Sequence, residues 1–108
     1  MFQPFDAYYS FLRVEKGLSE NTVQAYSHDL RQFREFLIQR QLSLAEVQGE
    51  HVALYIKVLE ENSIGARSRA RKISALRSFF DYLLDEQIVG SNPCAYLSAP
   101  KLPKSLPQ

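Results

Sequence analysis

Apolar residues recur at helical spacing along most of the chain and divide it into four long predicted helices. The first runs from about Pro4, a residue favoured in a first helical turn, to Lys16, with Gly17 as its C-terminal stop. The second begins at the N-cap Ser19 and continues to about Arg40. Because helix-period patterning fills most of the sequence, the expected fold class is all-α.

The second half of the chain adds a short turn and two more helices. Residues 43–46 have the Ser-x-x-Glu spacing of a capping box and predict a short helical turn, which Gly49 ends. A third helix is predicted over 50–61, a loop over 62–65 and a fourth helix over 66–87. The apolar stripes of these helices predict a core that includes Val23, Tyr26, Leu30, Phe33, Leu59, Ile73, Leu76, Phe80, Leu83 and Leu84.

The second and fourth predicted helices carry polar faces opposite their apolar stripes. On the second helix this face has hydrogen-bonding groups with little formal charge. On the fourth, small residues beside arginines let a helix backbone approach a polyanion while the guanidinium groups reach around it. A face exposed only to solvent has no need of small residues, and Lys/Glu pairs are commoner there. These outward residues are Asn21, Gln24, Ala25, His28 and Gln32 on the second helix, with Arg31 beside them, and Arg67, Ala70, Arg71, Ser74 and Ser78 on the fourth.

Composition changes this picture little, but the distribution of charge sharpens it. The 108 residues, of which 45% are hydrophobic and 23% charged, are typical of one globular domain. The net charge is only +1, yet five of the 13 basic residues lie between Glu61 and Asp81, where no acidic residue occurs. The other eight basic residues stand against all 12 acidic ones. A basic block on an otherwise acidic domain predicts one anion-binding face, although an ordinary solvated helix face has the same charge pattern.

The sequence also indicates which kinds of site and segment the chain is not expected to contain. No apolar run approaches the roughly 20 residues of a membrane span, and the N-terminus lacks the features of a signal peptide. The single cysteine, Cys94, gives no internal disulfide and no thiolate metal cage, and it is expected to be packed or half-buried. No convergent acid, base or nucleophile set indicates a catalytic residue. We therefore expect a cytoplasmic protein with no cofactor, no metal, no membrane contact and no small-molecule substrate.

Three stretches of the chain carry motifs that belong together. Residues 17–30 read GLSENTVQAYSHDL, similar to the pattern GLS-x-NT-x-x-AY-x-x-DL. Residues 73–83 read ISALRSFFDYL, similar to LSALR-x-F-x-x-YL. Residues 92–93 read NP, residues 99–101 read APK and residues 106–107 read LP, similar to an NP…PK…LP passage. In their order and spacing, these stretches resemble the tyrosine site-specific recombinases and phage integrases, and within that family the Xer type.

The resemblance implies a compact all-α core-binding domain, often called SAM-like, over residues 1–98, with four long helices plus short turns. A linker rich in proline and lysine over 99–108 would lead to a catalytic domain beyond this chain. In the family this domain forms half of a clamp around DNA, and its second and fourth long helices enter the major groove. The intact protein would cut and rejoin DNA with a tyrosine nucleophile. The implied partners are double-stranded DNA with a recombination site and other recombinase protomers in a tetrameric synapse.

The outward faces and the resemblance together predict a set of DNA contacts. Arg67 and Arg71 are expected to pair with a guanine edge or to hold a phosphate, and the sequence leaves both possibilities open. Arg69 departs from the family, which often has an apolar or small residue there, and it is expected to snorkel outward. The full predicted set is Asn21, Thr22, Gln24, Ala25, His28, Arg31, Arg67, Ser68, Arg71, Lys72, Ser74, Arg77 and Lys101.

A function of a different class stays open, namely a stand-alone helical protein-interaction module. Phe11 and Val14 on the first predicted helix, and Leu54 and Val58 on the third, are apolar residues outside the main stripes. In a recombinase the same residues would serve contacts between protomers. Salt separates the two functions, because DNA affinity falls steeply with ionic strength whereas apolar association does not.

Overall fold

A computed structural model of the chain describes residues 3–95 and contains four α-helices and one short 3-10 turn. No β-strand occurs within these residues, and the predicted all-α fold is confirmed. The predicted linker over 99–108, with Lys101, lies outside the described residues. The elements are α1 (Gln3–Val14), α2 (Glu20–Arg40), the 3-10 turn η1 (Leu44–Glu46), α3 (Gly49–Glu61) and α4 (Ala66–Asp85).

The predicted helix boundaries agree with the structure to within two residues. The first and fourth helices end at Val14 and Asp85, each two residues before the predicted end, as is common where a last turn frays. The third helix begins at Gly49, one residue earlier than predicted. Gly17, the predicted stop after α1, has a φ of 64°, in the left-handed region that glycine adopts without steric cost.

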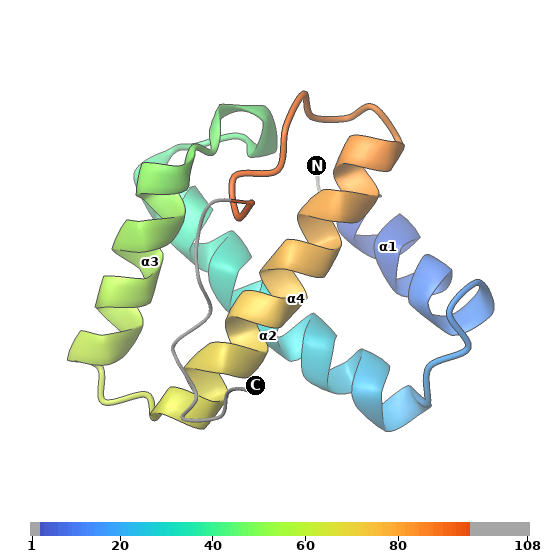
Figure 1. Cartoon of the computed structure of the whole chain (residues 1–108), viewed down its shortest axis with the longest axis horizontal. Helices are drawn as coiled ribbons and strands as arrows, with labels where there is room; N and C mark the ends of the chain where they lie inside the picture. The colour runs from blue at the N-terminus through green and yellow to red at the C-terminus, as the bar shows by residue number, and fades with distance from the viewer. Residues whose placement is uncertain (1–2, 96–108) are drawn as a thin grey trace, which may run out of the picture.

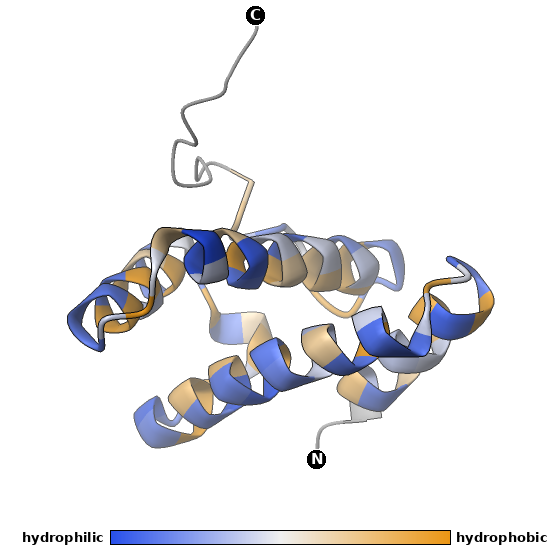
Figure 2. Cartoon of the chain, turned by 90° about the horizontal axis from the view of Figure 1, so that it is seen from below, coloured by the Kyte–Doolittle hydropathy of each residue, from blue (hydrophilic) through white to orange (hydrophobic). Residues whose placement is uncertain are grey.

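The long helices α2 and α4 make the central contact of the fold. In Figure 1 they cross with α4 in front of α2, while α1 lies on one side of the crossing and α3 on the other. Figure 2 shows hydrophilic and hydrophobic positions alternating along each helix, as expected of amphipathic helices that pack on a shared core. The crossing therefore brings side chains of α2 and α4 together at the centre of the domain.

The helices bury their apolar stripes in one core, with two exceptions to the prediction. Tyr26, predicted to be buried, is half-buried and packs against the core from its edge. Leu84 is exposed because it lines an open pocket between α1 and α4. The predicted stripe residues that are buried are Val23, Leu30, Phe33, Leu59, Ile73, Leu76, Phe80 and Leu83.

Aromatic side chains attach α1 to α4. The rings of Phe5 and Phe79 stack with their centroids 4.6 Å apart. The hydroxyl of Tyr8 donates a hydrogen bond to Oγ of Ser78 at 2.8 Å. Tyr8 is fully buried, and burial raises its pKa to about 12. These contacts fix α1 against the second half of α4.

After α4 the chain folds back onto the domain in a turn over residues 92–94. Asn92 is buried, and its Nδ2 donates to the backbone carbonyl of Arg77 at 3.2 Å and to Oδ1 of Asp81 at 2.7 Å. Its Oδ1 accepts a hydrogen bond from the backbone N–H of Cys94 at 2.8 Å. Cys94 is fully buried, and burial raises the pKa of its thiol to about 11. The turn thus attaches the chain to the middle of α4.

Candidate nucleic-acid interface

The first halves of α2 and α4 lie on the same side of the molecule. Both helices begin at the lower edge of the domain in Figure 1 and converge toward their crossing. The crossing is marked by Asp29 of α2, which contacts Arg71 of α4. The two helix segments before it form the arms of a V. We call the exposed polar surface along these helices the α2–α4 face, and we define it by Asn21, Gln24, His28, Arg67, Arg71 and Ser74, all of which are exposed. Arg31 is also exposed and lies beside this face, on the side of α2 that is near Tyr9 of α1.

The remaining predicted contact residues lie deeper than this face or outside the described chain. Lys72 is predicted among the DNA contacts, but the structure buries it. Arg77 lies beside the turn over 92–94, where its backbone carbonyl accepts the hydrogen bond from Asn92. Lys101 is not among the described residues. The half-buried members of the predicted set are Thr22, Ala25, Ser68 and Arg77.

Asp29 ties α2 to α4 at their crossing. Both of its carboxylate oxygens accept hydrogen bonds from Arg71, Nε to Oδ2 and Nη2 to Oδ1, each at 2.8 Å. Nζ of Lys72 donates to Oδ1 of Asp29 at 2.8 Å and to Oε1 of Gln32 at 2.6 Å. One carboxylate therefore holds two adjacent basic residues of α4. We call Asp29, Gln32, Arg71 and Lys72 the Asp29 cluster.

Burial and pairing decide which charges of the Asp29 cluster can reach a partner. Burial by itself raises the pKa of Asp29, but the hydrogen bonds and charges of Arg71 and Lys72 outweigh it, and the pKa lies below its ordinary value. The hydrogen bonds to Asp29 raise the pKa of Arg71 in turn. The side chain of Arg71 is 46% exposed, whereas that of Lys72 is 5% exposed. The charge of Lys72 is therefore paired with Asp29 inside the domain, whereas the guanidinium of Arg71 is accessible at the surface.

The first turn of α2 is organised by its own side chains. Oγ of Ser19, the predicted N-cap, accepts a hydrogen bond from the backbone N–H of Thr22 at 3.2 Å and donates to Oγ1 of Thr22 at 3.0 Å. Glu20 accepts two hydrogen bonds from Arg13 of α1, each at 3.0 Å, and one from Nε2 of Gln24 at 3.3 Å. The negative charge at the start of this arm is therefore paired with a neighbouring arginine.

The two arginines in the first turn of α4 differ in their exposure and in their partners. Arg67 is exposed on the α2–α4 face and forms no ion pair with any residue between 3 and 95. Arg69 was expected to snorkel outward, but its Nη1 donates to the backbone carbonyl of Ile64 at 2.6 Å. Its Nε lies 3.9 Å from Oε2 of Glu60. Arg69 turns inward because the loop before α4 offers a carbonyl within its reach, and it closes the connection between α3 and α4.

Asp29 and Gln32 have roles that the sequence did not reveal. Gln32 is predicted only as part of a polar face, and Asp29 only as a letter of a motif. One signal was present, because Asp29 directly precedes Leu30 at the edge of an apolar stripe, where a carboxylate needs a partner. The basic pair Arg71 and Lys72 could supply that partner, but only the packing of α2 on α4 shows that it does.

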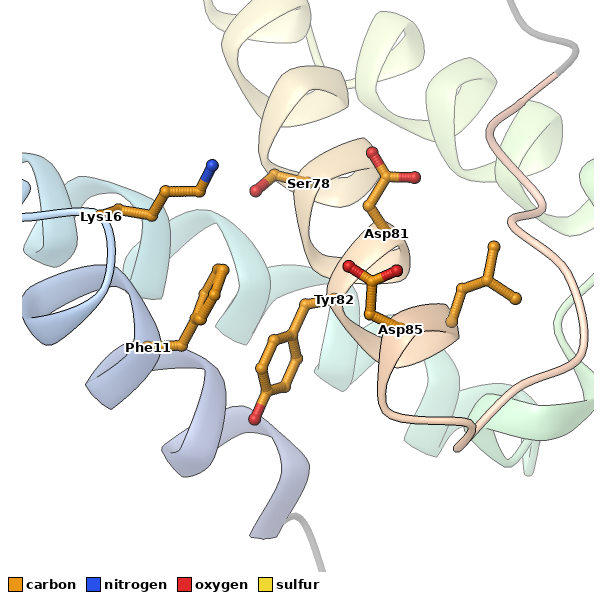
Figure 3. A pocket seen from close by; sticks show the side chains of 7 residues that line it. Phe11, Lys16, Ser78, Asp81, Tyr82 and Asp85 are labelled. Atoms are coloured by element: carbon orange, nitrogen blue, oxygen red, sulfur yellow. The ribbon is translucent and has the colours of Figure 1, made fainter.

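A pocket of about 340 Å³ lies between α1 and α4. Figure 3 shows Phe11 and Lys16 on one side of it and Asp81, Tyr82 and Asp85 of α4 on the other. Ser78, predicted on the polar face of α4, lines the same pocket. Two carboxylates stand here against one ammonium group, a balance that does not favour a polyanion. The pocket is therefore separate in its chemistry from the α2–α4 face.

The described residues contain neither a cluster of metal-binding side chains nor a helix that could span a membrane. Among residues 3–95, no three histidine, cysteine, aspartate or glutamate side chains gather in a way that could hold a metal ion. No helix in this range has the length and apolar character needed to cross a bilayer.

Known proteins are similar to this chain in sequence over most of its length. Residues 5–87 match the family model of the phage integrase, N-terminal SAM-like domain. The chain is 40% identical to the tyrosine recombinase XerC of Leptospira interrogans (strain Fiocruz L1-130) over 100 residues, which cover 92% of this chain and 32% of the relative. It is 41% identical to XerC of Staphylococcus aureus (strain USA300) over 105 residues, 95% of this chain and 35% of the relative. It is 33% identical to the tyrosine recombinase XerD of Agrobacterium fabrum over 103 residues, 95% of this chain and 31% of the relative.

These matches confirm the resemblance carried by the three motifs. The family model spans most of α1 and all of α2, α3 and α4, which are the helices that build the core. The chain spans about one third of the length of the curated relatives that it matches. From its motifs, its all-α fold and these matches, the chain belongs to the family of phage integrase N-terminal SAM-like domains, as found in the Xer-type tyrosine recombinases.

Proposed function

We propose that this chain is the DNA-binding domain of a tyrosine recombinase and that its α2–α4 face grips the recombination site in the major groove. The observation that carries the proposal is the crossing of α2 and α4 at the Asp29–Arg71 ion pair, which arranges two helices with exposed polar residues in the shape of a V. A major groove about 12 Å wide admits an α-helix, so each arm of the V fits the shape of duplex DNA.

The side chains on and beside the α2–α4 face have the chemistry that duplex DNA requires. Arg31 and Arg67 are exposed cations that suit phosphates, which supply most of the salt-dependent affinity. Gln24 is suited to pair with adenine, and the small Ala25 lets α2 approach a thymine methyl group. The carboxylate at the crossing, Asp29, is buried and paired, so it presents little negative charge to the DNA.

We also propose that this part of the protein binds DNA without cutting it. A tyrosine nucleophile must lose its proton to attack a phosphate. Burial raises the pKa of Tyr8 to about 12 and also raises the pKa of Tyr55, and neither of these buried hydroxyls is exposed to a phosphate at the surface. Cutting and rejoining would belong to the remaining two thirds or so of a full-length recombinase, as judged from the length of the Xer relatives.

In the full-length protein we infer further contacts around the same DNA, in the cytoplasm. Lys101, in the predicted linker, would follow the DNA backbone, and other recombinase protomers would assemble on the recombination site. An isolated domain lacks the second half of such a clamp and the neighbouring protomers, and it therefore loses the benefit of linked binding sites. Its affinity is best measured at low salt.

A titration of the 108-residue chain with a fluorescent mixed-sequence duplex tests the proposed function. Binding should weaken steeply as salt increases, because cations on and beside the α2–α4 face release counterions from the DNA. The double substitution of Arg31 and Arg67 by alanine should reduce the slope of log affinity against log salt by about two, roughly one for each phosphate contact. Glu35→Ala, an exposed change elsewhere on α2, serves as the matched control and should not weaken binding. Unchanged binding by the folded double variant would refute the proposal.

One observation favours a second function, that of a helical protein-interaction module. Val14 is 78% exposed at the end of α1, and Phe11 of the same helix lines the pocket between α1 and α4. Apolar association persists at high salt, whereas DNA binding does not. Analytical ultracentrifugation at high salt would support this module if the chain self-associates and if Val14→Ser makes it monomeric. A monomer under all conditions would exclude self-association through this surface.

A further inference from the structure

One edge of the Arg71 guanidinium is occupied by the protein. Nε and Nη2 donate to the two oxygens of Asp29 in a bidentate pair, with both bonds at 2.8 Å. A guanidinium carries five N–H donors in one plane, and this pair uses two of them. The carboxylate is 1% exposed whereas the Arg71 side chain is 46% exposed. The occupied edge therefore faces the protein, and the end formed by Nη1 and Nη2 keeps a parallel pair of donors for a partner at the surface.

The Asp29 cluster also fixes the plane of that guanidinium. Asp29 is held by a second cation, because Nζ of Lys72 donates to its Oδ1 and to Oε1 of Gln32. Rotation of the carboxylate would break these bonds in a site that water scarcely reaches. An arginine side chain ordinarily loses conformational freedom when it binds a partner, but Arg71 has lost much of that freedom already in the folded domain. The result is a preoriented donor pair at the crossing of α2 and α4.

The charge around Arg71 favours a neutral acceptor over a phosphate. The Asp29 carboxylate offsets much of the positive field of the guanidinium but leaves its outward donors in place. Guanine presents O6 and N7 side by side in the major groove, two acceptors that match such a fork. Arg67 differs, because it is exposed and has no ion pair with any residue in the range 3–95. Its full charge is therefore available to a phosphate.

We propose that Arg71 reads a guanine base in the major groove through its outward donor pair and that Asp29 is the residue that positions it. This inference rests on the proposed function, since it requires that the α2–α4 face meets DNA. It assigns separate tasks to two arginines one helical turn apart. Arg71 determines sequence preference, and Arg67 contributes affinity through the phosphate backbone.

Selection from a pool of randomised duplexes tests the assignment of Arg71. The 108-residue chain, Arg71→Ala and Arg67→Ala are compared at low salt, after circular dichroism has shown that each is folded. Arg71→Ala should lose about 5- to 150-fold of its preference at one G·C position and keep its preferences elsewhere. Its salt slope on mixed-sequence DNA should stay near that of the wild type. Arg67→Ala should instead weaken binding to all sequences and lower the slope by about one.

A variant that removes the carboxylate without leaving a buried unpaired ammonium tests the role of Asp29. The double variant Asp29→Asn/Lys72→Met keeps the charge of Arg71 but removes the carboxylate, and the single amide oxygen of asparagine cannot accept both parallel hydrogen bonds. Its preference at the same G·C position should fall, while its affinity for mixed-sequence DNA is kept. Lys72→Met alone is the matched control and should keep the preference. Arg71→Ala should cost less preference in the double variant than it costs in the wild type, a result that a purely structural role of Asp29 would not produce.

Three outcomes would overturn this inference while leaving the proposed function intact. They are a wild-type selection without a preferred G·C position, a uniform loss for Arg71→Ala with a lower salt slope, and an unchanged preference in the double variant. Failure of the wild type to bind any duplex in a salt-dependent way would instead refute the proposed function itself.

Discussion

Replacing Asp29 with alanine should destabilise the domain far more than replacing its partner Lys72 with methionine. Asp29→Ala leaves the Lys72 ammonium, which is 5% exposed, with Gln32 as its remaining hydrogen-bond partner among the described residues. Removing one partner of a buried ion pair costs about 3–5 kcal/mol, because the other charge stays buried without compensation. Lys72→Met removes the buried cation and leaves Asp29 paired with Arg71, so we expect a change of less than about 1.5 kcal/mol.

The buried ammonium dominates this expected cost, and Arg71 adds little to it. The side chain of Arg71 is 46% exposed, so solvent screens it, and its loss of a partner contributes at most about 1 kcal/mol. In a domain of this size, 1 kcal/mol corresponds to a shift of about 4–8 °C in Tm. A cost of 3–5 kcal/mol therefore lowers Tm by roughly 12–40 °C and removes a large part of the about 5–15 kcal/mol that stabilises a typical domain.

Urea denaturation at neutral pH, followed by circular dichroism, measures these differences. The wild type, Asp29→Ala, Lys72→Met and the double variant Asp29→Ala/Lys72→Met form a double-mutant cycle. The double variant should recover part of the stability lost in Asp29→Ala, because it contains no unpaired buried charge. The reasoning is refuted if Asp29→Ala costs less than about 1 kcal/mol, as a surface ion pair would. It is also refuted if Lys72→Met costs as much as Asp29→Ala.

Three further predictions address the core, the response to acid and the activity. Leu76 is buried, and Leu76→Ala should lower the free energy of unfolding by about 2–5 kcal/mol in the same assay; a negligible cost would place Leu76 outside the core. Because the pKa of Asp29 is lowered in the folded state, its contribution is fully present above the ordinary carboxyl pKa of about 4 and is lost as pH falls through the lowered value. Urea midpoints should therefore fall more in acid for the wild type than for Asp29→Asn/Lys72→Met, and parallel curves would contradict this linkage. Incubation of the chain with supercoiled plasmid should give neither nicks nor a covalent adduct, whereas an adduct would identify a nucleophilic tyrosine in the chain.

The helices and most of the core could be predicted because they depend on local patterns. Helical spacing predicts the direction in which a side chain points from the axis of its helix, and it correctly placed residues such as Leu30 and Phe80 in the core. It does not predict how much of the apolar face of a helix a neighbouring helix covers. Tyr26 and Leu84 were therefore predicted to be buried, although one lies at the edge of the core and the other lines an open pocket.

The two polar faces of the site could be predicted, but the contact that joins them could not. Asp29 and Arg71 are 42 residues apart in the sequence, and no helical period states where two helices cross. The same crossing explains why Lys72 lies inside although it belongs to a basic stretch. A carboxylate on the facing helix binds the ammonium directly, and the protein buries both groups.

The turn over residues 92–94 has a mechanical consequence for whatever pulls on the chain after residue 95. Tension applied there passes through Asn92 into the middle of α4, at Arg77 and Asp81, and bypasses the last helical turn at Asp85. The two side-chain bonds to α4 and the bond from the backbone N–H of Cys94 resist such a pull together. A frayed helix end would instead open one bond at a time. When the chain after residue 95 is pulled, the turn, α4 and the α2–α4 face should therefore move together as one rigid body.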